Sequence, residues 1–354
     1  MQRSPVKLSQ PVLCIAAGKS GGHLIPALQL AQRWHDQHGG GSVVLCTYGT
    51  ELDQKIYAQY PFIKHVQAFS FTTFVARKLW LYPVISFQAL KACVTSWHLL
   101  RKNRPEKVIT TGGFVALPVS IAARVLGIPV EVYELNVHAG KAVKALALLG
   151  AKIFVVFEET LKQFSKATLV DYPIRFIDKD FYTAAEARRI LAAQTSSRIP
   201  LVDSRRTLFV LGGSQGSQYL NDLVLKFIEA RPQLHEKIQI IHQAGWNVER
   251  YADAYEKYRI PHVVFDFHPA IAACYQAADV TLCRAGAGTL FELKFFKRPA
   301  ILIPLVAAST GHQAANADAL VAQCSELFVA WSQAAIEQNV ESFFDEVGAR
   351  LFGY

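Results

Sequence analysis

The sequence of 354 residues lacks the cysteine spacings that form disulfide frameworks or zinc sites. Its six cysteines lie far apart, with no CxxC pair and no cysteine-histidine cluster. This spacing predicts free thiols in a reducing compartment. The N-terminal segment also lacks a long apolar run before a cleavage site, because the run Val12–Ala17 stops at a glycine. We therefore expect no export signal and a location inside the cell.

Two common nucleotide-binding motifs are missing as well. The letters GKS at 18–20 resemble the end of a P-loop, but that motif needs a glycine where this sequence has Leu13. Neither glycine-rich turn matches GxGxxG, and no acidic residue directly closes the expected strand at 43–46. These absences argue against ATP hydrolysis and leave a nicotinamide or flavin enzyme as a fold-level analogy only.

No segment combines membrane-spanning length with an unbroken apolar sequence. The stretch Leu79–Leu100 is long enough, but Pro83, Gln88, Lys91 and His98 interrupt it. Aromatic and basic residues are interleaved around it: Phe69, Phe71, Phe74, Arg77, Lys78, Trp80, Tyr82, Phe87, Lys91, Trp97, Arg101, Lys102, Arg104 and Lys107. The pattern predicts a surface that lies on anionic lipid, and an ordinary buried helix with a basic face is the alternative.

Positive charge is concentrated in the first half of the chain. Residues 1–175 contain 20 Lys and Arg against 9 Asp and Glu, whereas the remainder contains 17 against 19, for a net charge of +9. A basic half suggests an anionic partner such as a nucleic acid, a phosphate-bearing substrate or an acidic lipid surface, although a basic face can also serve solubility alone.

Short β-branched runs alternate with helix-length segments along the whole sequence, which predicts an α/β protein with two Rossmann-like domains and parallel sheets. The expected strands are Val12–Ala16, Val43–Cys46, Val108–Thr110, Val130–Tyr133, Ile153–Val156, Thr207–Leu211, Ile238–His242, Val263–Asp266, Val280–Cys283 and Ala300–Pro304. Pro173 marks the expected junction. We expect domains at 1–172 and 173–332, and a C-terminal helix at 333–354 that can return toward the first domain.

Both halves open with a strand, a glycine-rich turn and a helix, at 18–23 and 212–216. Backbone N–H groups at such turns can hold phosphates. His23, at the start of the first helix, suits a general base, with a capping or packing role as the alternative.

In the second half, small residues at 283–289 precede Glu292, which can accept two ribose hydroxyls, and 311–316 places amides and an imidazole where they can bind a sugar. Helix capping by Thr289 and solvated polar side chains are the alternatives. The joint placement of these residues after strands favours a binding site.

Eight motifs, in order, resemble those of the MurG glycosyltransferase family. They are GKSGGHLIPAL at 18–28, TGGFV at 111–115, YELN at 133–136, YPIR at 172–175, GGSQGS at 212–217, HQAG at 242–245, ADVTLCRAGAGTLFE at 278–292 and HQAANA at 312–317. The resemblance covers nearly the whole chain. It implies the GT-B fold, in which two Rossmann-like domains face a central cleft.

The resemblance also implies an activity. GlcNAc would pass with inversion from UDP-GlcNAc to the 4-hydroxyl of MurNAc in undecaprenyl-pyrophosphoryl-MurNAc-pentapeptide, during peptidoglycan synthesis. The partners would be these two substrates and the anionic cytoplasmic surface of the inner membrane, to which the protein would bind peripherally. No nucleic acid, no cofactor and no obligatory metal are expected.

The resemblance implies roles for individual residues. The catalytic group would be His23 as base, with Asn136 and Glu134. The donor would be bound by Arg175, Ser214, Gln215, Phe267, His268, Arg284, Gly286, Ala287, Thr289, Glu292, His312, Gln313 and Asn316. The acceptor pyrophosphate would be bound by Ser20, Gly21, Gly22, Gly112 and Gly113.

The sequence departs from the family pattern at several motif positions, among them Lys19, Tyr133, Leu135, Gly288 and His312. The departures leave two further interpretations. One is a UDP-sugar transferase with a different lipid or glycan acceptor, and the other is a non-catalytic relative that binds a nucleotide sugar.

Overall fold

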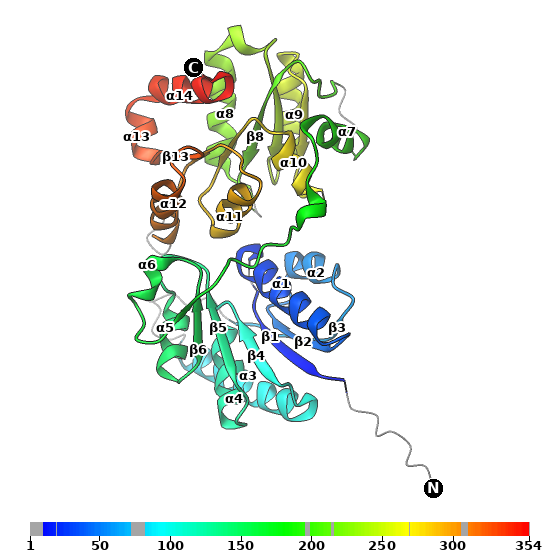
Figure 1. Ribbon diagram of the computed structural model, residues 1–354, viewed down its shortest axis with the longest axis vertical. Helices are drawn as coiled ribbons and strands as arrows, with labels where there is room; N and C mark the ends of the chain where they lie inside the picture. Colours follow the sequence, from blue (N-terminus) through cyan, green and yellow to red (C-terminus); the bar gives the residue numbers. More distant parts are fainter. Residues whose placement is uncertain are drawn as a thin grey trace. The chain divides into compact units, whose positions relative to one another are not determined.

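A computed structural model describes residues 10–18, 20–71, 82–194, 199–213, 216–268, 270–305 and 311–353. Of the residues singled out above, Lys19, Phe74, Arg77, Lys78, Leu79, Trp80, Ser214 and Gln215 lie outside these ranges. The chain divides into two compact units, Met1–Arg175 and Phe176–Tyr354 (Figure 1). Each unit contains one parallel sheet, which confirms the predicted pair of Rossmann-like domains.

The first unit is a sheet of order β3-β2-β1-β4-β5-β6-β7 with a helical layer on each face. Its strands are β1 (Val12–Ala16), β2 (Ser42–Thr47), β3 (Ile63–Ala68), β4 (Lys107–Thr110), β5 (Val130–Glu134), β6 (Lys152–Val155) and β7 (Thr168–Leu169). Its helices are α1 (Gly21–Gln37), α2 (Glu51–Tyr57), α3 (Tyr82–Asn103), α4 (Ala116–Val125), α5 (Lys141–Leu148) and α6 (Glu158–Leu161). Because side chains alternate along β1, Leu13 packs with α1 and α2, whereas Cys14 packs with α3, α4 and α5.

The second unit repeats this plan with the order β10-β9-β8-β11-β12-β13. Its strands are β8 (Arg206–Leu211), β9 (Ile238–Gln243), β10 (His262–Phe265), β11 (Val280–Cys283), β12 (Ala300–Leu302) and β13 (Phe328–Ala330). Its helices are α7 (Ala184–Gln194), α8 (Gln218–Ala230), α9 (Val248–Lys257), α10 (Ile271–Ala277), α11 (Ala287–Phe295), α12 (His312–Gln323), α13 (Gln333–Gln338) and α14 (Val340–Phe352). The apolar face of α14, including Phe343 and Leu351, packs into the core of this second unit.

In both sheets the first strand lies in the interior of the sheet. The strands that follow it are added first on one side of it and then on the other, so the strand order reverses there. β1 pairs with β2 on one side and with β4 on the other, and β8 pairs in the same way with β9 and β11. Ligands of open parallel sheets bind outside the carboxyl ends of the strands at such a switch point. The turns that follow β1, β4, β8 and β11 are therefore the expected places for bound ligands.

The helices in the described part of the chain are too short or too polar to cross a bilayer.

Candidate active site

The two glycine turns of the first unit follow the strands at its switch point. Ala16 of β1 stands beside Thr110 of β4, so the residues after each strand come together at one edge of the sheet. Gly112 and Gly113 both have positive φ, at 93° and 85°, a conformation that favours glycine. Helix α1 begins after Ser20 with no side-chain cap and no acidic residue in its first turn, so its backbone N–H groups suit an anion.

His23 joins these two turns. Its Nδ1 lies 3.0 Å from the carbonyl oxygen of Thr111, and the hydroxyl of Thr111 donates to the carbonyl oxygen of His23 at 2.9 Å. Because a carbonyl only accepts, Nδ1 carries the proton and Nε2 carries the lone pair in the neutral ring. This is the tautomer that a general base needs at Nε2.

Glu134 organises the turn after β5. Its Oε1 accepts from the backbone N–H of Asn136 at 3.0 Å and from the side-chain amide of Asn136 at 3.1 Å. Its Oε2 accepts from the backbone N–H of Gly140 at 2.8 Å. Glu134 as a whole is 3% exposed, so these contacts make it a group that positions Asn136.

Two of the departures from the family pattern flank this carboxylate and have packing roles. Tyr133 stacks on Phe154 with ring centroids 4.6 Å apart, and burial raises the pKa of Tyr133 to about 12. Leu135 is buried. Neither change removes the contacts between Glu134 and Asn136.

The glycine turn after β8 is set by close backbone contacts. Gly216 has a φ of 73°, and a Cβ there would lie 2.7 Å from the carbonyl oxygen of Ala244. Ala244 is itself fixed, because its carbonyl accepts from the side-chain amide of Asn221 at 2.9 Å. Asn221 accepts in turn from Nε2 of His242, whose Nδ1 accepts from the hydroxyl of Tyr255 at 2.7 Å. Burial lowers the pKa of His242 to about 3, so this chain of hydrogen bonds contains a neutral ring.

Arg284, the first residue after β11, is held by groups of its own unit. Its Nε donates to the Ser217 hydroxyl at 3.1 Å, and its Nη1 donates to the Ile303 carbonyl at 3.1 Å and to the Gln333 side chain at 3.0 Å. The guanidinium also lies over the Tyr219 ring. Burial lowers the pKa of Arg284. These contacts tie the turn after β8 to the end of β12.

Helix α11 begins after Gly286, and Ala287 and Thr289 lie in its first turn with no side-chain cap and no acidic residue. Glu292 follows one turn later and is 7% exposed. The hydroxyl of Tyr275 donates to Oε2 of Glu292 at 2.8 Å, which fixes the direction of the carboxylate. A carboxylate held in this way can accept hydrogen bonds from two vicinal hydroxyls.

Phe267 and His268 follow β10 at the same edge of the second sheet. Phe267 is 40% exposed, whereas His268 is buried and accepts from the backbone N–H of Ala270 at 3.1 Å through Nδ1. Its Nε2 is therefore the protonated nitrogen, and it has no hydrogen-bond partner among the described residues. Burial lowers the pKa of His268. The pair thus offers an aromatic face and a buried N–H donor.

Helix α12 begins at His312 without a side-chain cap. Gln313 accepts from the backbone N–H of Leu305 at 2.9 Å through its carbonyl oxygen, which leaves its amide N–H groups for another acceptor. The Nδ1 of His312 is buried and has no partner within the described ranges. Asn316 is fully buried one turn further along.

Three of the residues expected to bind the sugar donor have not yet been placed: Arg175, Ser214 and Gln215. Arg175 is the last residue of the first unit. Ser214 and Gln215 lie outside the described residues. Thr111, Ser217 and Tyr275 were not named as site residues, although each directly positions one that was. Thr111 and Ser217 lie within glycine motifs, whereas no local pattern marks Tyr275.

Within the described ranges, no three His, Cys, Asp or Glu side chains form a group that could hold a metal ion.

Two family descriptions match the chain. The glycosyltransferase family 28 N-terminal domain matches residues 13–155, and the glycosyltransferase family 28 C-terminal domain matches residues 207–347. These segments contain both switch points.

Relatives extend over most of the chain. A UDP-N-acetylglucosamine–N-acetylmuramyl-(pentapeptide) pyrophosphoryl-undecaprenol N-acetylglucosamine transferase of Trichodesmium erythraeum is 32% identical over 319 residues, which cover 90% of this chain and 77% of the relative. The protein of the same name from Francisella tularensis is 30% identical over 327 residues, covering 89% and 83%.

Solved structures agree. MurG of Acinetobacter baumannii is 25% identical and superposes with a TM-score of 0.70 over 97% of this chain and 92% of its own. A UDP-GlcNAc 2-epimerase from Methanocaldococcus jannaschii, 13% identical with a TM-score of 0.58 over 91% of this chain and 89% of its own, shares the fold alone. The chain, whose two Rossmann-like units have the GT-B architecture, therefore belongs to glycosyltransferase family 28 and, within it, to the MurG family.

Proposed function

We propose that this protein transfers GlcNAc from UDP-GlcNAc to the 4-hydroxyl of MurNAc in undecaprenyl-pyrophosphoryl-MurNAc-pentapeptide. The names of the relatives support the substrates. The observation that carries the chemistry is the pair of hydrogen bonds between His23 and Thr111, because it leaves a basic nitrogen where two glycine turns meet.

The reaction needs one base. Nε2 of His23 accepts the proton of the acceptor hydroxyl as its oxygen attacks the anomeric carbon from the face opposite the bond to UDP. That bond breaks, UDP leaves with its electron pair, and the configuration inverts. The turn that contains Gly112 and Gly113 and the first turn of α1, at Ser20, Gly21 and Gly22, hold the acceptor pyrophosphate. Asn136 and Glu134 act on the acceptor sugar, Glu134 through Asn136.

The second unit holds the donor. Glu292 binds the ribose hydroxyls, and Phe267 and His268 contact the uracil. The uncapped starts of α11 and α12 stabilise the leaving diphosphate, which is the task a metal performs in other transferases. His312, Gln313 and Asn316 bind GlcNAc. Ser214, Gln215 and Arg175 complete this site, and Arg284 acts by fixing Ser217.

The first unit binds peripherally to the cytoplasmic face of the inner membrane through α3, α4 and α5. Val84, Phe87 and Leu90 of α3 are 46%, 69% and 64% exposed. The three helices carry six Lys and Arg and no Asp or Glu. An exposed apolar stripe with a basic border is typical of proteins that lie on anionic lipid.

The deciding experiment is transfer of radiolabelled GlcNAc from UDP-GlcNAc to the lipid-linked acceptor in detergent, with a chelator present. We expect labelled disaccharide lipid and release of UDP. No product from a protein that still binds UDP-GlcNAc would contradict the proposal. A screen of other lipid and glycan acceptors would then separate a transferase of different specificity from a non-catalytic relative. A reaction that needs added Mg²⁺ would contradict metal independence.

A further inference from the structure

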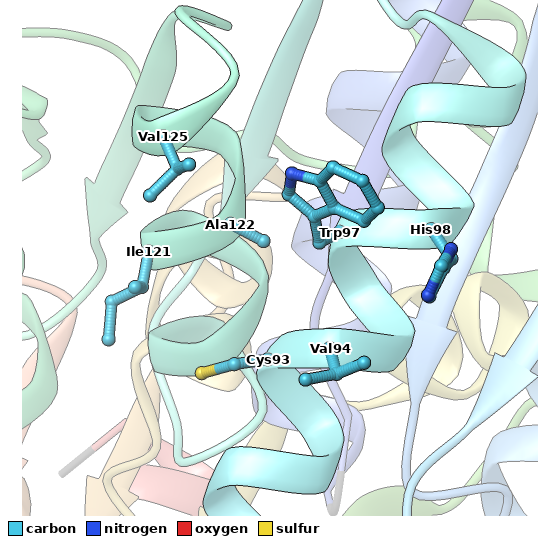
Figure 2. Close-up of a pocket in the computed structure, with 7 residues that line it drawn as sticks. All are labelled: Cys93, Val94, Trp97, His98, Ile121, Ala122 and Val125. Atoms are coloured by element: carbon cyan, nitrogen blue, oxygen red, sulfur yellow. The ribbon is translucent and has the colours of Figure 1, made fainter.

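An apolar groove of about 390 Å³ lies between α3 and α4 of the first unit (Figure 2). Its lining residues are Cys93, Val94, Trp97 and His98 from α3, and Ile121, Ala122 and Val125 from α4. The rim is open to solvent, because Val94, Ile121 and Val125 are 50%, 40% and 72% exposed. The volume is in the lower range for a site that takes one small ligand, and a stable protein partner would need a much larger surface.

The charges around the groove select an anionic amphiphile. The guanidinium of Arg101 lies 5.0 Å from the centroid of the Trp97 ring, and Trp97 lines the groove. The guanidinium of Arg124, the residue before Val125, lies against Gly150 after α5, so Arg101 is the cation at the groove. No acidic residue occurs in α3 or α4. An alkyl chain in the groove would therefore place an attached phosphate near Arg101.

The position of the groove separates it from the proposed acceptor site. Helix α4 begins just after Gly113, at the carboxyl edge of the sheet, and the groove uses its second half, Ile121–Val125. Arg101 likewise lies in the last turn of α3. The cationic end of the groove thus points to the opposite edge of the sheet from the glycine turns. A chain attached to a pyrophosphate at those turns would enter from the other end.

We propose that this groove takes one acyl chain of an anionic glycerophospholipid, with the lipid phosphate near Arg101. The inference rests on the proposed membrane association and deepens it, because the surface then binds an individual lipid in addition to resting on the bilayer.

Cys93 provides a direct probe of occupancy. All six cysteines lie within the described residues; Cys93 is partly exposed and the other five are buried. Burial raises the pKa of the Cys93 thiol, so alkylation is best followed above pH 8. A chain in the groove would cover this thiol.

The experiment follows alkylation of Cys93 by N-ethylmaleimide in the full-length protein, with lysophosphatidylglycerols of 8, 10 and 12 acyl carbons below their micelle concentrations. We expect protection whose half-maximal concentration falls about fourfold for each added methylene while the chain still fits. Lysophosphatidylcholine of equal length should protect less at low salt, and the difference should shrink at high salt. The Cys93→Ala variant should show no alkylation.

A matched pair of variants tests the location. Val125→Glu charges the groove and should weaken protection at least about tenfold, whereas Val202→Glu, at an exposed valine of the second unit, should leave it unchanged. Circular dichroism checks that both variants fold.

Protection that is absent, independent of chain length, or equal in Val125→Glu would overturn the proposal. So would protection by a prenyl phosphate but not by a linear acyl chain of equal carbon number. Transfer activity is measured in parallel. Lost protection with intact transfer refutes the groove alone, and lost transfer with intact protection refutes the proposed reaction alone.

Discussion

At the scale of single residues, His23 owes its chemical state to a backbone atom of Thr111, 88 positions away along the chain. A carbonyl cannot be changed by a side-chain mutation, so this tautomer depends on the path of the main chain. The protonation of His23 at Nδ1 is therefore maintained as long as β1 and β4 remain paired.

Replacing His23 by alanine should lower kcat by roughly 10²- to 10⁴-fold, because the acceptor hydroxyl loses its base. The dissociation constant for UDP-GlcNAc should stay within about twofold, since the proposed nucleotide site lies in the other unit. Steady-state kinetics and calorimetry measure the two quantities. The control is His65→Ala, an exposed histidine of β3. A variant with unchanged kcat but a raised acceptor KM would reassign His23 to phosphate binding.

Replacing glycine by alanine should have opposite effects on the free energy of unfolding at two positions. Gly216→Ala should reduce the free energy of unfolding by about 2 kcal/mol or more, because its φ is positive and the new Cβ meets a backbone carbonyl. Gly348→Ala should raise it by about 0.5–1 kcal/mol, because Gly348 is inside α14 with open space around it. Urea unfolding measures both changes, and effects of equal sign would contradict this account.

Much of the candidate site could be predicted from the residues, but its internal contacts could not. The positions of His23, Glu292 and Gln313 after strands and glycine turns make them candidates, and the family resemblance adds Glu134. The partner of Glu292 is Tyr275, 17 residues earlier on another helix, and only the packing of α10 against the sheet brings them together. A local sequence pattern cannot predict a contact between side chains on two different helices.

At the scale of elements, the predicted strands were the buried ones. All ten are present, and Val12–Ala16 and Val280–Cys283 have the predicted bounds. The three strands that the sequence did not predict, β3, β7 and β13, all lie at sheet edges. Residues of β3 and β7 are largely exposed or half-buried, so they lack the continuous apolar run that marks a central parallel strand.

The buried chain of hydrogen bonds through His242 predicts a pH dependence of stability. His242 has a pKa of about 3 when folded and about 6.5 when unfolded, so the unfolded state binds one more proton between these values. The free energy of unfolding should therefore fall by about 1.4 kcal/mol per pH unit as the pH drops below about 6.5. His268, whose pKa is also lowered, adds to the slope.

The test compares urea unfolding of the wild type and His242→Gln at pH 7, 6 and 5. The variant should be less stable at pH 7, because its hydrogen bonds to Asn221 and Tyr255 are disturbed, but its stability should fall less steeply with acid. Equal slopes would show that His242 is not the titrating group.

At the scale of the whole molecule, each unit has its own core and should respond separately to ligand. Scanning calorimetry should show two transitions, and UDP-GlcNAc at 100 times its dissociation constant should stabilise the second unit by about 2.7 kcal/mol. Phe343→Ala and Leu28→Ala, which remove buried side chains from the second and the first unit, assign the transitions. A ligand that moved both transitions equally would contradict separate binding.

The strand order has a consequence for how the protein is made. In each unit the central strand leaves the ribosome first, yet one of its two neighbours comes much later: β8 ends at Leu211, and β11 begins only at Val280. At roughly 5–20 residues per second, one side of β8 stays without its partner for several seconds in every round of translation. The nascent chain should therefore depend on ribosome-associated chaperones for longer than the nascent chain of a protein in which paired strands are also consecutive in sequence.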